Sequence, residues 1–509
     1  MGTSSSVPGR VFLVGAGPGD PGLLTLRAAE VLQSAEVLLY DALASDAIVA
    51  LAPASCERVY VGKRAGDHAM PQEEIERLAI DRARAGSRVV RLKGGDPFIF
   101  GRGGEEAQAF AAAGVAFEIV PGVSSAYAAP AYAGIPVTHR EFAASFTVAT
   151  GHEDPSKAVS SLDWAKLADP QRTLVLLMAT ANLGEIAKQL IAHGLAPQTP
   201  VAVVQDGTRP SQRTVLGRLD SIAEDVAAAK IGAPAVVVVG GVAGLRAQLR
   251  WFDTGALFGK RVLITRAGEQ SSEFARALLA RGAQPIVAPT IAIAPVADTS
   301  GADRAIDELA SYAWLIFTSQ NGVDAFFARL AAKNADTRAI GATKVAAIGE
   351  RTAARLRTLG VVADLVPAEF ISEEIAPEVI ARSSPGDRVL LYRAQEARDV
   401  LPQMLQAAGL SVTIVAAYST VIPPDAQFAQ KVAGADVLTF TSASTVRGFV
   451  ALLGDIAAPQ AAGGKCVACI GPITANAAAQ AGLNVDVVAP VHTTAGLLDA
   501  LEIYYATRV

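Results

Sequence analysis

The sequence predicts an α/β protein whose parallel sheets are covered by helices on both faces. Three observations predict this class: half of the residues are apolar (51%), aromatic residues are few (6%), and short Val, Ile and Leu runs alternate with Ala-rich helical stretches. Continuous apolar strands between helices are typical of parallel sheets that are buried on both sides. At about 150 residues per domain, a chain of 509 residues is expected to contain roughly three or four domains.

Strands are expected throughout the first half of the chain, each followed by a helical pattern or a Gly-rich loop. After them, an apolar segment (245–252) leads into Asp-Thr-Gly-Ala-Leu-Phe-Gly, which is expected to be a linker that ends at Gly259. A strand at 261–265 then opens a second region. The strands expected before the linker span residues 11–14, 36–40, 88–92, 116–120, 145–149, 173–177, 200–204 and 235–239.

The second region contains an internal repeat. Three pairs of segments match at nearly constant offsets of 127, 123 and 122 residues, which indicates two similar α/β domains and is too long a period for a solenoid. Two sister domains normally hold their site in the cleft between them. The paired segments are 259–266 with 386–393, 315–322 with 438–445, and 347–352 with 469–474.

Composition and charge exclude several classes of protein. The net charge of −5 argues against non-specific nucleic-acid binding, and three cysteines are too few for a disulfide scaffold. Cys466 and Cys469 lie three apart in an expected strand, so their thiols would point to opposite faces, and the five histidines show no ligand spacing. No metal site is therefore expected. Because no apolar run approaches the ~20 residues of a membrane span and the start lacks a signal peptide, a cytoplasmic location is expected.

A Gly-rich loop follows the first strand. Gly17, Gly19 and Gly22 fit the pattern GxGxxG, and Asp41 closes the second strand about twenty residues later, which together is the pattern of a dinucleotide site. Two prolines inside the loop count against that reading, because each removes an amide that a pyrophosphate would bind.

Cations lie in the loops beside the strand ends. Lys63 and Arg64 occupy one turn, and the segment 91–102 carries Gly94-Gly95-Asp96 at the carboxyl end of a strand, where parallel sheets bind ligands. A solvated surface is the ordinary reading of such charges. Their position in Gly-rich loops favours recognition of a carboxylate or phosphate instead.

Residues 10–253 resemble uroporphyrinogen-III C-methyltransferase, of the tetrapyrrole methylase family that acts in sirohaem and cobalamin synthesis. The motifs that carry the resemblance are GAGPGDPGLLT, YD, GKRAGDHAMPQEEI, RLKGGDPFIFGRGGEE, PGVSSA, AGIPVTHR, TGHE and QDGTRPSQRTVLG, in the order of the family. The segment Leu-Met-Ala-Thr at 177–180 departs from the family's Tyr-Met-Gly. The resemblance implies two α/β subdomains, about 10–137 and 138–253.

That resemblance also implies a chemistry and its residues. S-adenosylmethionine would methylate uroporphyrinogen III twice to give precorrin-2, with Asp41 as proton acceptor and Lys63 as proton donor. Asp41 is alternatively a capping residue of its strand, and Lys63 and Arg64 are alternatively clamps for the substrate's carboxylates. The family further implies a homodimer formed through this half. The cofactor-binding residues that it implies are Pro18, Gly94, Gly95, Asp96, Ile99, Ser124, Ser125, Met178 and Gly207.

Residues 259–509 resemble uroporphyrinogen-III synthase, which closes the linear hydroxymethylbilane to uroporphyrinogen III. The repeat, the motifs FTSxNG and AIGxxTA, and the position after a methylase carry this resemblance. It implies one domain formed by 259–296 with 420–509, a second domain at 297–418, and Tyr418 as a proton donor. Hydroxyls at expected helix starts would bind carboxylates or serve as plain caps. They are Thr318, Ser319, Ser442, Ser444 and Thr474.

A second interpretation of the chain stays open from the sequence. The glycine loop and Asp41 are also consistent with an NAD-dependent oxidoreductase in the first half. The second half shows no nucleophile, metal cluster or acid–base pair, so it is also consistent with a non-catalytic binding module.

Overall fold

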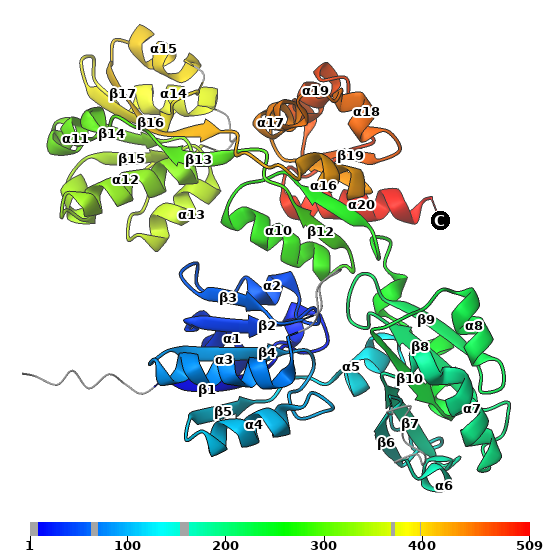
Figure 1. Cartoon of the computed structure of the whole chain (residues 1–509). Coiled ribbons are helices and arrows are strands. Elements are labelled where there is room, and N and C mark those ends of the chain that lie inside the picture. The colour runs from blue at the N-terminus through cyan, green and yellow to red at the C-terminus, as the bar shows by residue number, and fades with distance from the viewer. Residues whose placement is uncertain (1–8, 63–69, 153–161, 368–371, 398, 509) are drawn as a thin grey trace, which may run out of the picture. The chain divides into compact units, whose positions relative to one another are not determined.

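Four five-stranded sheets with flanking helices make up the described part of the chain (Figure 1). The structure is a computed structural model that describes residues 9–62, 70–152, 162–367, 372–397 and 399–508. The chain divides near Lys260 into two compact units. The predicted α/β class is confirmed, and each unit carries two of the sheets.

The first sheet is wholly parallel, as predicted, with the order β3-β2-β4-β1-β5. Because the strands share one direction, their carboxyl ends meet at one edge, and the loops after β1, β2 and β4 lie side by side there. The strands are β1 (Arg10–Gly15), β2 (Val37–Tyr40), β3 (Glu57–Tyr60), β4 (Arg88–Lys93) and β5 (Ala116–Val120).

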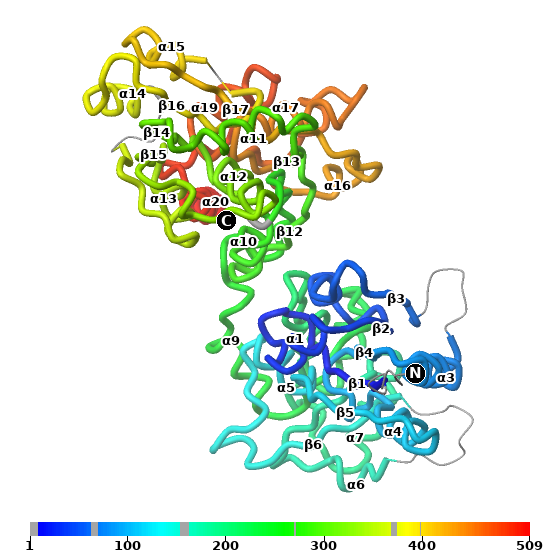
Figure 2. The backbone as a smooth tube through the Cα atoms, turned by 90° about the vertical axis from the view of Figure 1, so that its left-hand side faces the viewer, coloured from blue at the N-terminus to red at the C-terminus, as the bar shows by residue number. Residues whose placement is uncertain are grey.

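Helices cover both faces of this sheet. Figure 2 shows α1 on one side of the strands and α3 and α4 on the other. Alternate residues of β1 point to the two faces, so Phe12 and Val14 pack under α1 while Val11 and Leu13 pack under α3 and α4. The helices are α1 (Leu26–Gln33), α2 (Asp46–Val49), α3 (Gln72–Arg84), α4 (Gly103–Ala112) and α5 (Ser125–Tyr132).

The second sheet is mixed, and here the prediction of parallel sheets is wrong. Its order is β6-β7-β10-β8-β9, in which β10 runs antiparallel to both neighbours and β9 antiparallel to β8. A central strand buried on both faces is a continuous apolar run in either direction, so composition does not distinguish the two cases. The strands are β6 (Ser145–Thr150), β7 (Arg172–Leu177), β8 (Pro200–Gln205), β9 (Arg213–Arg218) and β10 (Ala235–Val239).

Two strands of this unit do not appear among the expected ones. Both β3 and β9 are edge strands, and β9 has polar or exposed residues along most of its length. An edge strand has a neighbour on one side and solvent on the other, so it lacks the continuous apolar run that marks a buried strand.

Helices of the second sheet complete this unit. Helix α5 packs on the second sheet through Ala126 and Ala129, and its C-cap Ala133 joins the same core, although all three lie before the predicted subdomain bound near 137. The remaining helices are α6 (Trp164–Leu167), α7 (Leu183–Ala192), α8 (Ile222–Ala228) and α9 (Arg246–Leu249), with 3₁₀ turns at Pro21–Leu23, Thr180–Asn182, Gly241–Leu245 and Phe252–Thr254.

The second unit contains two sheets that exchange strands between the sequence repeats. One has the order β12-β11-β18-β19-β20 and the other β13-β17-β16-β14-β15. The strands β11, β18 and β19 are the repeat partners of β16, β14 and β15, so each sheet holds strands from both copies. The strands are β11 (Arg261–Ile264), β12 (Gln284–Val287), β13 (Ala292–Pro295), β14 (Trp314–Phe317), β15 (Lys344–Ala347), β16 (Arg388–Ala394), β17 (Ser411–Val421), β18 (Val437–Phe440), β19 (Cys466–Cys469) and β20 (Val487–Val488).

The strand β13 differs from the predicted domain bounds. Those bounds assign 259–296 to the domain of β11, whereas β13 pairs antiparallel with β17 in the other sheet. The helices of this unit are α10 (Glu269–Leu279), α11 (Ser300–Asp307), α12 (Gln320–Ala332), α13 (Glu350–Thr358), α14 (Ser372–Ala381), α15 (Val400–Ala407), α16 (Phe428–Gly434), α17 (Ala443–Leu453), α18 (Ala458–Ala462), α19 (Pro472–Gln480) and α20 (Thr494–Ala506), with 3₁₀ turns at Leu309–Ser311 and Thr337–Ile340.

No helix within the described residues has the length and apolar composition that a bilayer crossing needs. No group of three or more His, Cys, Asp or Glu side chains within them is placed to hold a metal ion. Cys466 and Cys469 lie buried in β19, the strand in which they were expected.

Glycine is required where the loops after β1, β4 and β5 cross. A Cβ atom placed on Gly122 would lie 2.2 Å from the carbonyl oxygen of Gly95 and 2.7 Å from the Cα of Gly15. We therefore expect Gly122→Ala to lower the free energy of unfolding of the first unit by about 1–3 kcal/mol, as overpacking does, in urea denaturation.

Gly104→Ala is the matched control for this substitution. Gly104 lies in α4 with no atom within 4 Å of its added Cβ, so alanine there should be neutral or stabilise by up to about 1 kcal/mol. Equal stability of the two variants would contradict the steric argument.

Candidate functional site

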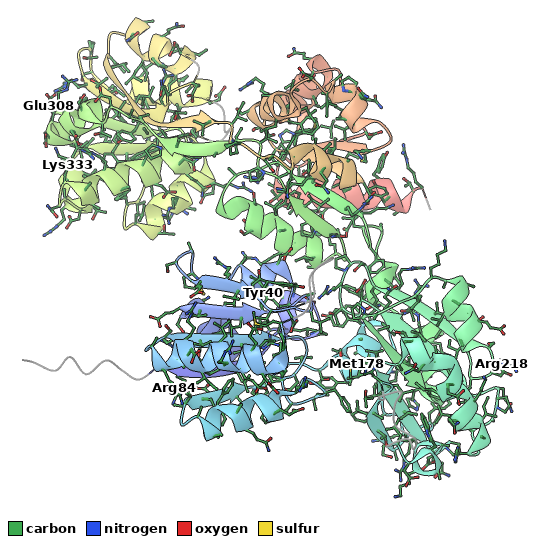
Figure 3. All side chains as sticks on the ribbon, in the orientation of Figure 1. Tyr40, Arg84, Met178, Arg218, Glu308 and Lys333 are labelled. Atoms are coloured by element: carbon green, nitrogen blue, oxygen red, sulfur yellow. The ribbon has the colours of Figure 1, made fainter. Side chains whose placement is uncertain are left out.

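A cavity of about 520 Å³ opens at the carboxyl edge of the first sheet. Its walls come from the loops after β1, β2 and β4, and from the ends of β7, β8 and β10 in the second sheet of the same unit. In Figure 3, Met178 lies at the end of β7 between the parts of the chain that carry the two sheets. The volume is in the range of sites that enclose a small molecule.

Most of the predicted cofactor residues line this cavity together with Asp41. Asp96 and Ser124 support the cavity wall without lining it. The Asp96 carboxylate accepts hydrogen bonds from the Phe98 and Gly122 amides at 2.8 and 3.0 Å, and Ser124 caps α5. Lys63 and Arg64 lie outside the described residues. The predicted residues that line the cavity are Pro18, Asp41, Gly94, Gly95, Ile99, Ser125, Met178 and Gly207.

Two glycines join the loops after β1 and β4. The Gly95 amide donates to the Gly17 carbonyl at 2.7 Å, and the Gly17 amide donates to the Gly95 carbonyl at 3.1 Å. Both residues have positive φ angles, +72° for Gly17 and +65° for Gly95, which side chains disfavour. The sequence predicted that these glycines let the backbone approach a ligand. Their two hydrogen bonds also hold the two loops together.

Strained backbone gathers around the cavity. Phe100, Arg102, Met178 and Asp206 have φ angles between 49° and 59° although none is glycine, and all four line the cavity. Such conformations cost on the order of 1–3 kcal/mol each and persist where the surroundings hold them, commonly at ligand sites. The backbone around the cavity is therefore held in shape by its neighbours.

The floor of the cavity is a buried cluster of charges. Arg91 and Lys93 come from β4, and both contact Oε1 of Glu106 on α4, with Arg91 Nε at 3.3 Å and Lys93 Nζ at 2.9 Å. Arg91 also reaches Oδ2 of Asp41 at 3.4 Å, and the Leu43 amide donates to the other oxygen of Asp41 at 3.1 Å. These bonds hold the Asp41 carboxylate at the cavity wall, with its side chain 24% exposed.

Sequence reasoning did not single out Arg91, Lys93 or Glu106 as site residues. The available signal was two cations at alternate positions after the apolar pair Val89 and Val90, which places both on one face of the strand. Glu106 gave no such signal, because its role depends on how α4 packs against β4. Burial, followed by the charge of Arg91, lowers the pKa of Lys93 below its usual value.

A ring of hydrogen bonds ties the glycine loop to the second sheet. The Asp20 amide donates to Thr208 Oγ1 at 3.1 Å, and the Thr208 amide donates to Gln212 Oε1 at 2.9 Å. Gln212 Nε2 donates to the Tyr132 carbonyl at 3.3 Å, and the Tyr132 hydroxyl donates to Asp20 Oδ2 at 2.7 Å. Burial and this carboxylate raise the pKa of Tyr132. The ring holds the two halves of the cavity wall together.

The predicted serines and threonines of the second unit lie at or beside helix starts, whereas Tyr418 lies in a strand. Ser319 caps α12, and its hydroxyl lies 3.0 Å from the hydroxyl of Tyr418 in β17. Ser442 caps α17 with Thr445 as its capping-box partner. The structure therefore brings Tyr418 and Ser319 together, whereas Ser442 and its neighbour Ser444 belong to a helix of the other sheet.

The two remaining predicted residues, Thr318 and Thr474, occupy ordinary structural positions. Thr318 lies between β14 and the cap of α12, and Thr474 is buried in the first turn of α19. A buried hydroxyl in a first helical turn is consistent with a plain structural role.

Comparison with known families covers both units. Residues 10–223 match the family model of tetrapyrrole (corrin/porphyrin) methylases, and residues 272–499 match that of uroporphyrinogen-III synthase HemD. A Ruminiclostridium josui protein, named porphyrin biosynthesis protein HemD, is 36% identical over 97% of this chain and 97% of its own.

Two further relatives match the first unit and beyond. An S-adenosyl-L-methionine-dependent uroporphyrinogen III methyltransferase of Methanosarcina barkeri is 52% identical over 49% of this chain and 98% of its own. A uroporphyrinogen-III C-methyltransferase of Bacillus subtilis is 39% identical over 76% of this chain and 77% of its own.

The hydrogen-bond ring predicts the effect of removing the Tyr132 hydroxyl. Tyr132→Phe keeps the aromatic contacts with Trp251 and Phe252 but removes the donor to Oδ2 of Asp20, whose Oδ1 still accepts from the Gly22 amide. We expect the free energy of unfolding of the first unit to fall by about 0.5–1.5 kcal/mol, measured by urea denaturation. Tyr127→Phe, at an exposed position of the same helix, should have no effect. A loss of equal size in both variants would refute the contribution of the ring.

Proposed function

Because the chain belongs to the tetrapyrrole methylase family in its first unit and to the uroporphyrinogen-III synthase family in its second, we propose that it converts hydroxymethylbilane to uroporphyrinogen III and methylates this product twice to precorrin-2. The chain is a bifunctional tetrapyrrole enzyme, a uroporphyrinogen-III C-methyltransferase joined to a uroporphyrinogen-III synthase, and it uses S-adenosylmethionine. The order of the two reactions follows from their chemistry, since the product of the second unit is the substrate of the first.

The proposal for the first unit rests on one observation: the cavity combines a wall of glycine backbone with a floor of buried charged side chains. The backbone at Gly94 and Gly95 offers amides and carbonyls to a ligand, while Asp41 and Arg91 face the same space. A cofactor held by backbone beside a polyanionic substrate needs both features.

The residues around the cavity fit S-adenosylmethionine. Ile99, Met178 and Val236 supply an apolar wall, and the glycine pair leaves room where side chains would otherwise project. When bound, this cofactor supplies a methyl group on a cationic sulfonium. The chain's own contribution is to hold the two reactants together and to exclude water, which accelerates a transfer of this kind.

Asp41 is the proposed proton acceptor. Methylation of a pyrrole carbon must be followed by loss of a proton from the macrocycle, and a carboxylate at the cavity wall can accept that proton. Arg91 and the Leu43 amide orient the Asp41 carboxylate while its side chain stays partly exposed to the cavity. Lys63 as proton donor and Arg64 as a carboxylate clamp remain predictions.

In the second unit, Tyr418 and Ser319 are the proposed acid and its partner. Loss of hydroxide from an activated pyrrole needs only modest acid assistance, and a tyrosine hydroxyl that lies 3.0 Å from a serine hydroxyl can provide it. The hydroxyls and amides at the starts of α12 and α17 would bind substrate carboxylates.

The homodimer and the cytoplasmic location remain predictions. The family assignment replaces the alternative of an NAD-dependent oxidoreductase with a non-catalytic second half. The geometry gives a reason: Gly17 is engaged with Gly95, and Asp41 is held by Arg91.

Asp41→Asn tests the role of the carboxylate. The amide keeps the size of the side chain but accepts no proton, so we expect methylation to fall by roughly 10²–10⁴-fold while cyclisation of hydroxymethylbilane continues at the normal rate. Chromatography of the tetrapyrrole products measures both. Asp46→Asn, at an exposed position of α2, is the control. Normal methylation by Asp41→Asn would remove Asp41 from the mechanism.

The two units should also act separately, since each has its own sheets and cores. A fragment of residues 1–260, which keeps the buried Arg246–Asp253 ion pair, should methylate uroporphyrinogen III. A fragment of residues 259–509 should convert hydroxymethylbilane to the type III isomer without S-adenosylmethionine. If the second fragment yields only the type I isomer, the spontaneous product, the proposed synthase activity is not a property of that unit by itself.

A further inference from the structure

Lys93 is a buried cation that the mechanism above does not use. It is the last residue of β4 and lies on the same face as Arg91, over a layer otherwise formed by apolar residues such as Val89, Leu13 and Phe110. Its side chain is 7% exposed, and it lines the cavity. A lysine in such a layer carries a desolvation cost that an apolar side chain would avoid.

The described residues supply Lys93 with fewer hydrogen-bond acceptors than it has donors. An ammonium has three donors, and among the described residues one acceptor lies within reach of Nζ, the Oε1 atom of Glu106 at 2.9 Å. The same oxygen also accepts from Arg91 Nε at 3.3 Å and from Gln72 Nε2 at 2.9 Å. One oxygen thus serves three donors, and two of them are cationic.

The charges of the cluster are also unevenly placed. Glu106 is fully buried and serves both cations, while the second carboxylate, Asp41, contacts Arg91. Arg91 therefore has two anionic partners and Lys93 shares one. A ligand carboxylate beside Lys93 would give its ammonium an anionic partner that it does not share with Arg91 and would accept from its remaining donors, and the cavity is the side from which that carboxylate can enter.

We propose that Lys93 binds a carboxylate of the macrocycle inside the cavity and thereby selects substrates that carry acetate side chains. The inference rests on the proposed function of the first unit. Lys93 directly precedes Gly94 and Gly95, the predicted cofactor backbone, so the carboxylate that it binds belongs close to the pyrrole carbon that receives the methyl group. In uroporphyrinogen III that carbon bears an acetate.

The electrostatics of Lys93 agree with this assignment. Burial and the Arg91 guanidinium lower the pKa of Lys93, and Glu106 acts in the opposite sense. A substrate carboxylate would add to the effect of Glu106 and favour the ammonium form. The charged groups around Lys93 are Arg91 on its own strand, Glu106 on α4 and Asp41 after β2, with Gln72 on α3 as the neutral neighbour.

Lys93→Met in the full chain tests the proposal. We expect the KM for uroporphyrinogen III in methylation to rise roughly ten- to hundredfold, the effect of losing one charged hydrogen bond, while the Kd for S-adenosylmethionine and the cyclisation rate stay unchanged. Lys93→Arg, which keeps the charge, should recover part of the loss. Lys188→Met, at a surface position of α7 whose side chain is 78% exposed, is the control and should match the wild type.

A direct binding measurement separates this inference from the proposed function. Uroporphyrin III, the oxidised macrocycle with all its carboxylates, should bind Lys93→Met more weakly than wild type. Coproporphyrin III, in which methyl groups replace the acetates, should bind both proteins alike. If the wild type binds uroporphyrin III with this Lys93 dependence but gives no methylated product, the proposed function fails and the carboxylate site stands.

The remaining outcomes overturn the proposal. An unchanged KM in a folded Lys93→Met, or an equal loss of affinity for S-adenosylmethionine and macrocycle, would make Lys93 a structural partner of Glu106. Because the single variant leaves Glu106 with less compensation, the double variant Lys93→Met/Glu106→Gln, which removes both charges, provides the same test if the single variant does not fold. Full retention of macrocycle affinity in the double variant would also refute the carboxylate site.

Discussion

The crossing of three backbone segments at the carboxyl edge of the first sheet is the constraint on which the shape of the cavity depends. Gly15, Gly95 and Gly122 approach so closely that a Cβ atom on Gly122 would lie 2.2 Å from a carbonyl oxygen. Asp96 fastens the crossing by accepting amide hydrogens from Phe98 and Gly122. Since these loops supply the wall beside the predicted cofactor, their close packing places backbone polar groups where a ligand can use them. The ring of hydrogen bonds through Tyr132 then ties this wall to the second sheet.

The floor of the cavity is formed by charged residues on a buried face of β4. Alternation along β4 places Arg91 and Lys93 together over the layer of α3 and α4, where cations are costly without a partner. Glu106 meets that requirement for both, and Arg91 in turn orients Asp41. The packing of α4 therefore decides the geometry of a carboxylate on another loop. Three residues of the cluster, Asp41, Arg91 and Lys93, also line the cavity, so the packing that stabilises the cluster sets part of the cavity wall.

In the second unit a serine caps the helix after the strand at two equivalent positions, and the two serines differ in what they contact. Ser319 and Ser442 occupy equivalent places in the sequence repeat, and each caps the helix that follows its strand. Ser319 also contacts the hydroxyl of Tyr418, whereas Ser442 exchanges hydrogen bonds with Thr445 in a capping box. The two sheets are therefore similar in build, and the tyrosine marks one of them as the place of the proposed acid.

We could predict from the sequence the α/β class, the strands of the first sheet apart from β3, the glycine loops and the position of Asp41, because each depends on residues near one another in the chain. Tertiary packing fixed the remaining features. It set the antiparallel direction of β10, the edge strands β3 and β9, and the exchange of β11 and β16 between the sheets of the second unit. It also joined Glu106 to Lys93 and Tyr418 to Ser319. These contacts form when separate elements pack together. The local pattern of a strand or helix does not indicate which other element it will pack against.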